Sequence, residues 1–243
     1  MWHTTRYSMM LWAYPPHDGA ATVAEMIRLL GKTSDFPLSW YLENQPHRPL
    51  PTSPEGWATL AKEQRNTHFG ALDLFLDSPS GLVMSLSVDA PEFVRDFDVL
   101  TVGIDSEHLT GPQAMFGFDS LYTMFTESIK LFRPFWAAVR DSDIVLTDEF
   151  REIRLSVDGT KLPFAIDWLN YFDQDMAERL GGVQKLLDAP AYLVERAEDP
   201  VGIILALQRQ PFDCHDLEDL RRQRKIAEYL DLPKLHAMYP RQR

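Results

Sequence analysis

The chain has 243 residues, of which 45% are hydrophobic and 12% aromatic, and this composition supports a sizeable folded core and excludes a disordered chain. A single cysteine, Cys214, excludes an internal disulfide framework, and no stretch reaches the ~18–20 apolar residues of a membrane-spanning helix. The net charge of −12 disfavours nucleic acid and anionic membranes as partners and favours basic ones, while solubility alone also accounts for such a surface.

The N-terminal part predicts strands that alternate with amphipathic helices. Residues 6–14 predict a strand that ends at Pro15-Pro16, and the start lacks a secretory signal, so we expect a cytoplasmic protein. Apolar residues at i, i+3, i+4 and i+7 predict a helix over 20–30, with Asp18 or Thr22 as its cap and Gly31 as its end. A short strand at 38–42 and a helix at 54–63 follow.

The middle of the chain predicts an antiparallel meander and then a long helix. Leucines alternate over 72–76 and apolar residues alternate over 82–88, with a turn at 78–81 between them, so these segments predict a hairpin. Residues 98–104 predict a third strand. An apolar stripe predicts a helix over 119–132, capped by Asp119 or Ser120 and ended by Pro134.

The C-terminal part predicts two hairpins and a charged helix. Alternation around Asp158-Gly159 predicts a hairpin, and three aromatic residues follow at 168–172. Short helices at 174–180 and 183–188 lead to paired strands at 192–196 and 201–208. The last helix, 216–230, carries its acids in the first turn and its bases later, as the helix dipole favours.

This order of elements predicts an α+β fold, with a mostly antiparallel sheet and amphipathic helices packed on it. We expect one domain over residues 1–243. Two pseudo-repeated halves, 1–110 and 111–243, are the alternative, because each half carries an aromatic strand near an amphipathic helix and a hairpin.

Motifs of known chemistry are missing from the sequence. It has no P-loop, dinucleotide-binding glycine pattern or nucleophile elbow, and none of its seven histidines forms a His-x-His or His-x-x-x-His pair. Cys214 stands beside His215, but adjacent residues rarely present their side chains to one another in catalytic geometry. We therefore expect no catalytic residue, no metal site and no cofactor, and we expect the aromatic segments around Trp40 and Trp168 to pack in the core.

Three short segments carry a resemblance to a known family. They are Trp40-Tyr41-Leu42, the stretch from Gly181-Gly182 to Tyr192, and the tail strand leading to Pro211-Phe212-Asp213 and its helix. With the middle helix they span most of the chain, which resembles the bacterial immunity protein 52 family. That family often has an Asn-Pro helix start after the Pro-Phe-Asp corner, whereas this chain has Cys214-His215-Asp216-Leu217. A related type VI immunity family has a similar tail.

The resemblance implies an immunity protein of the type VI or polymorphic toxin class, which is not an enzyme. Such a protein binds its cognate toxin directly, here a restriction-endonuclease-like nuclease, and an acidic surface suits the basic cleft of a nuclease. We expect the toxin to contact acidic residues of one of two segments, and a solvated rim is the alternative for both. The preferred set is Asp141, Asp143, Asp148 and Glu149, and the second is Asp89, Glu92, Asp96 and Asp98.

Two other functions remain open from the residues alone. One is a hydrolase or metal-dependent enzyme that uses scattered carboxylates and histidines. The other is a module that binds a small ligand or peptide through its aromatic strands. The sequence also leaves open the toxin's reaction, the oligomeric state and the exact immunity family.

Overall fold

The computed structural model describes residues 6–15, 18–33, 39–43, 45, 47–65, 72–88, 97–110, 114–146 and 162–238. The chain divides into two compact units, Met1–Pro134 and Phe135–Arg243. Within each unit the strands pair antiparallel and helices accompany them, so the predicted α+β class is confirmed.

The sheet of the first unit has the strand order β2-β3-β4-β5-β1. Its hairpin β3–β4 and the third strand β5 lie where the leucine alternation predicts them, and β1 pairs with β5. The strands are β1 (Tyr7–Ala13), β2 (Tyr41–Leu42), β3 (Leu72–Asp77), β4 (Val83–Val88) and β5 (Asp98–Ile104).

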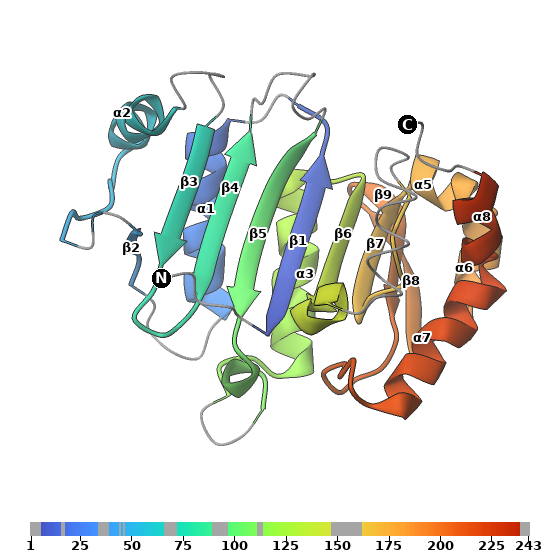
Figure 1. Cartoon of the computed structure of the whole chain (residues 1–243). Coiled ribbons are helices and arrows are strands. Elements are labelled where there is room, and N and C mark those ends of the chain that lie inside the picture. The colour runs from blue at the N-terminus through green and yellow to red at the C-terminus, as the bar shows by residue number, and fades with distance from the viewer. Residues whose placement is uncertain are drawn as a thin grey trace. The chain divides into compact units, whose positions relative to one another are not determined.

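One face of this sheet is buried under two helices. Leu74, Leu86 and Leu100 pair with one another across β3, β4 and β5, and each is about 1% exposed or less. Alternate residues of a strand point to the same face of the sheet, so these leucines lie on its buried face. Helices α1 (Gly19–Thr33) and α3 (Phe118–Phe132) pack against each other and lie behind the strands in Figure 1.

The helix ends of the first unit agree with the sequence in part. Asp18 caps α1 as predicted, since its Oδ1 accepts a hydrogen bond from the Ala21 N–H at 3.1 Å, but the helix continues past Gly31. Helix α2 (Pro54–Gln64) has the predicted proline in its first turn. Helix α3 starts after Gly117 with no side-chain cap, so the predicted cap at Asp119 or Ser120 was wrong.

A buried histidine fastens the β3–β4 turn to the segment that follows β5. His108, in the 3-10 turn η1 (Ser106–His108), accepts a hydrogen bond at Nδ1 from the Asp105 N–H at 3.1 Å. Its Nε2 lies 2.6 Å from the carbonyl oxygen of Ser80, within the turn that precedes Gly81. Because Nδ1 accepts, Nε2 carries the proton and donates it to this carbonyl.

The sheet of the second unit has the strand order β6-β7-β9-β8. The hairpin β8–β9 is the pair predicted around Asp199-Pro200, and the aromatic segment forms β7. The strands are β6 (Trp136–Asp141), β7 (Leu169–Asp173), β8 (Leu193–Glu198) and β9 (Val201–Ala206), and the 3-10 segment η2 (Ser142–Leu146) follows β6. The hairpin predicted at Asp158-Gly159 lies outside the described residues.

Four helices of the second unit are described. Helices α5 (Gln174–Arg179), α6 (Val183–Leu187) and α7 (Leu217–Tyr229) lie where the sequence predicts them. A further helix, α8 (Leu232–Met238), follows α7 and was not predicted from the sequence. Pro233 occupies its first turn, where a proline costs no hydrogen bond.

Two buried polar contacts help to hold the second unit together. Arg140, at the end of β6, forms an ion pair of 2.9 Å with Asp167, and both side chains are at most 5% exposed. Burial raises the pKa of Asp167 above its usual value, and Arg140 opposes this shift. His236 of α8 lies within 2.9 Å of the carbonyl oxygen of Pro163, and burial lowers its pKa. None of the helices in the described ranges is both long and apolar enough to cross a membrane.

Candidate functional site

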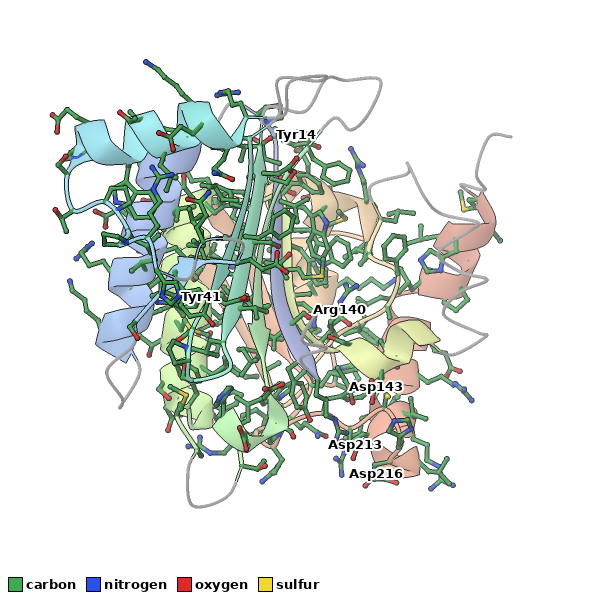
Figure 2. All side chains as sticks on the ribbon, turned by 60° about the vertical axis from the view of Figure 1, so that its left-hand side comes forward. Tyr14, Tyr41, Arg140, Asp143, Asp213 and Asp216 are labelled. Carbon is green, nitrogen blue, oxygen red and sulfur yellow. The ribbon has the colours of Figure 1, made fainter. Side chains whose placement is uncertain are left out.

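The end of β6 and the loop before α7 bring several carboxylates together in the second unit. Asp143 comes from η2, Asp213 and Asp216 come from the loop, and Figure 2 shows these three side chains in one region of the molecule. Glu218 follows in the first turn of α7, with its side chain 58% exposed. We call Asp143, Asp213, Asp216 and Glu218 the acidic face.

An exposed apolar side chain belongs to the same stretch. Leu217, the first residue of α7, is 69% exposed and stands between Asp216 and Glu218 in the chain. Asp216 caps the helix, because its carboxylate accepts a hydrogen bond of 2.7 Å from the Glu218 N–H. Leu217 is therefore an apolar side chain open to solvent within an acidic segment of the chain.

Asp141 lies beneath this surface rather than on it. It is 1% exposed, and its two carboxylate oxygens accept hydrogen bonds from the backbone N–H groups of Asp143 and Cys214, at 3.1 and 3.0 Å. These bonds join the end of β6 to the loop before α7. In the structure Asp141 therefore positions the acidic face, whereas Asp143, with its side chain 45% exposed, can meet a partner.

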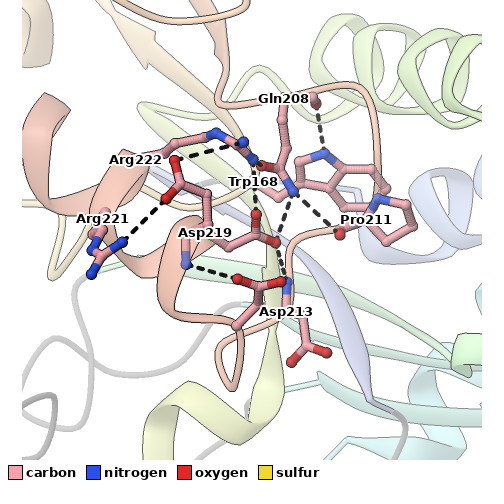
Figure 3. A network of polar contacts seen from close by, with 9 residues as sticks. Trp168, Gln208, Pro211, Asp213, Asp219, Arg221 and Arg222 are labelled. Atoms are coloured by element: carbon pink, nitrogen blue, oxygen red, sulfur yellow. Dashed lines mark hydrogen bonds and ion pairs between the residues drawn. The ribbon is translucent and has the colours of Figure 1, made fainter.

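A second buried carboxylate, that of Asp219, fixes the loop before α7 through hydrogen bonds, as Figure 3 shows. Asp219, 7% exposed, accepts hydrogen bonds at Oδ2 from the Asp213 N–H and from Gln208 Nε2, both at 2.9 Å. Its Oδ1 accepts from Arg222 at 3.0 Å, and Arg222 also donates to Gln208 Oε1 at 2.7 Å. The acidic face is thus built on a loop whose backbone is fixed before any partner binds.

Trp168 extends this network into the core. Its indole N–H donates a hydrogen bond of 2.9 Å to the backbone carbonyl of Gln208, and the side chain is 1% exposed. Tyr171 and Phe172, in the strand β7 that begins directly after Trp168, are fully buried. These aromatic side chains pack in the core, and they offer no surface to a ligand in the described structure.

Cys214 is a poor nucleophile in this setting. It is buried, and its pKa is raised to about 12 by burial first and then by the Asp141 carboxylate, with smaller contributions from Asp143 and Asp213. A thiol with this pKa is protonated at neutral pH, whereas a nucleophilic cysteine needs its thiolate form. The neighbouring imidazole of His215 contacts another group, with its Nε2 3.4 Å from Asp143 Oδ2.

The remaining residues of the two predicted toxin-binding sets lie elsewhere or are not described. Asp98, the first residue of β5, is 1% exposed and belongs to the interior of the first unit. The other five lie outside the described residues: Asp148 and Glu149 of the first set, and Asp89, Glu92 and Asp96 of the second.

The sequence did not predict that Asp213 and Asp216 lie in one region with Asp143. The helix dipole accounts for Asp216 and Glu218, and they do occupy the start of α7. The density of acids from Asp213 to Asp219 was the available signal. Their meeting with Asp143 depends on how β6 and the loop before α7 lie in the folded unit, about seventy residues apart in the chain.

Comparison with known proteins finds a similarity in structure but none in sequence. No family model matches the sequence, and no curated protein matches it. Among solved structures, the chain is similar to the Pseudomonas aeruginosa T6SS protein PA0821, with a TM-score of 0.59 and 13% identity over 93% of this chain and 72% of that one. The two share a fold. The resemblance to the immunity protein 52 family stays a prediction.

Proposed function

We propose that this chain is an immunity protein of a type VI secretion or polymorphic toxin system, which binds its cognate toxin directly and has no catalytic activity of its own. The observation that carries this proposal is the acidic face, with the exposed Leu217 next to two of its residues in the chain, on a loop fixed by Asp141 and Asp219. The fold shared with a protein that bears a type VI secretion title supports the same assignment.

Charge and geometry together favour a basic partner. The chain carries a net charge of −12, and a partner with a basic cleft, such as a nuclease, would be drawn toward such a surface over long distances. A surface that is rigid before binding pays less conformational entropy in forming a complex than a mobile one does. The raised pKa of Cys214 keeps its thiol protonated at neutral pH, which argues against a cysteine nucleophile at this position.

The direct test is co-expression with the toxin encoded beside this gene. We expect the chain to restore growth to a bacterium that produces the toxin, and to elute with it as one complex in size-exclusion chromatography. Failure of both rescue and complex formation would contradict the proposal.

A charge-reversal variant tests the binding face. D143K/D216K/E218K replaces three exposed or half-buried carboxylates of the acidic face. We expect it to lower the association rate constant about tenfold or more at low salt, because electrostatic steering contributes at least that much to charged pairs. The control D175K/E178K/E198K makes the same change of charge at exposed positions of α5 and β8. Equal loss in both variants would show that net charge acts, and not this face.

A further inference from the structure

Beside the acidic face, three successive residues bring together three kinds of metal-ligating atom. A carboxylate oxygen of Asp213, the sulfur of Cys214 and an imidazole nitrogen of His215 all lie within 4.8 Å of one another. Oxygen, sulfur and nitrogen donors of these side chains are the ligands of protein-bound Zn²⁺. A buried thiol in the set argues against Mg²⁺ and Ca²⁺, which prefer oxygen donors alone.

A carboxylate from another segment of the same unit contacts one member of this group. The Oδ2 atom of Asp143, in η2, lies 3.4 Å from Nε2 of His215. In a tetrahedral zinc site with bonds of about 2.0–2.1 Å, two such donors are separated by roughly 3.3 Å. The carboxylate and the imidazole therefore already have the spacing of two ligands on one ion.

The backbone that carries these donors is held by groups that do not themselves belong to the set. Asp141 accepts a hydrogen bond from the Cys214 N–H at 3.0 Å, and Asp219 accepts one from the Asp213 N–H at 2.9 Å. Within the set, Asp213 Oδ1 accepts from the His215 N–H at 2.9 Å, which folds the three residues into a turn. Supporting contacts of this type orient the ligands of metal sites.

We propose that Asp213, Cys214 and His215 hold a divalent transition-metal ion of the Zn²⁺ type, and that Asp143, which contacts His215, completes the site as a fourth ligand when the ion binds. On binding, the Cys214 thiol releases its proton to solvent and coordinates as thiolate, and the positive charge of the ion offsets the carboxylates around it. The ion fastens η2 to the loop before α7. The sequence predicted no such site, because three ligands are adjacent and the fourth is about seventy residues away.

The test is a zinc titration of the purified, chelator-treated full chain in a reducing buffer, followed by calorimetry. We expect one ion per chain. C214S and D143N should each raise the Kd for Zn²⁺ by more than the roughly 10–100-fold that loss of a supporting contact costs. H47A, which removes an exposed histidine in the first unit, is the matched control and should leave the Kd unchanged.

Cobalt gives a second readout that identifies the ligands. Co²⁺ bound to the wild-type chain should show a sulfur-to-metal charge-transfer absorption, which C214S abolishes and H47A retains. D143N alters an exposed side chain, so it tests the site even if the buried C214S change impairs folding. Absence of binding to the wild type, or an affinity that neither C214S nor D143N changes, would overturn the proposal. Neither result bears on toxin binding, which is measured separately.

Discussion

Asp141 is joined to the backbone of Cys214, 73 residues further along the chain, by a hydrogen bond of 3.0 Å. The same carboxylate accepts the Asp143 N–H through its other oxygen, so one buried side chain fixes both segments that carry the acidic face. The buried Asp141 carboxylate therefore has a structural role, although the sequence places it in an acidic stretch.

D141A should therefore destabilise the protein. It leaves two backbone N–H groups without their acceptor, and an orphaned buried donor costs about 1–3 kcal/mol. The free energy of unfolding, measured by urea denaturation, should fall by at least that amount. D143A removes a half-exposed carboxylate from the same region and should change it by about 0.5 kcal/mol or less. Equal effects of the two variants would refute the structural role of Asp141.

The buried pair of Arg140 and Asp167 leads to a second prediction. The pKa of Asp167 is raised by its burial in spite of Arg140, so desolvation outweighs the attraction between the two charges. D167L leaves Arg140 buried without this partner and should cost roughly 3–5 kcal/mol of unfolding free energy. The double variant R140M/D167L removes both charges and should be more stable than D167L. A double variant that is less stable than D167L would contradict this account.

The buried histidine of α8 predicts how stability depends on pH. An unfolded histidine binds its proton near pH 6.5, whereas burial lowers the pKa of His236 in the folded protein. As the pH falls below about 6.5, the unfolded chain takes up this proton before the folded chain does, and the free energy of unfolding decreases. H236Q should flatten that decrease in denaturation curves measured between pH 7 and 5. H47Q, at an exposed histidine, should keep it.

Leu217 predicts a separation between stability and binding. Its side chain is 69% exposed, so L217A should leave the free energy of unfolding within about 0.5 kcal/mol of the wild type. If Leu217 is the anchor of the toxin interface, L217A should weaken the complex by about 2 kcal/mol or more, which is roughly a 30-fold rise in Kd. Calorimetry with the purified toxin domain measures this. V201A, at another exposed apolar residue, is the control and should bind as the wild type does.

Local patterns predicted much of the fold. The alternation of leucines in β3 and β4 fixed which side of these strands is buried, and the stripe containing Met124 and Phe125 did the same for α3. Helix ends were less predictable. Gly31 lies inside α1 although it was predicted to end this helix, because a glycine ends a helix only where its position relative to the last turn requires it.

The candidate site was predictable only in part. Asp143 was expected at the surface, and its side chain is half exposed. The burial of Asp141 depends on contacts with Cys214 that no local pattern reveals, and so does the approach of His215 to Asp143. Side chains that meet across about seventy residues are placed by the pairing and packing of the whole unit, whereas periodicity describes only neighbours along the chain.

The contact of His108 with the β3–β4 turn has a consequence for how the first unit opens. One ring nitrogen is hydrogen-bonded to the Ser80 carbonyl and the other to the Asp105 N–H, so this one buried side chain links the turn of the hairpin to the end of β5. Neither segment can fray without breaking a hydrogen bond that also secures the other. We therefore expect strands β3, β4 and β5 to open as one unit, with amide protons that exchange with solvent together and not strand by strand.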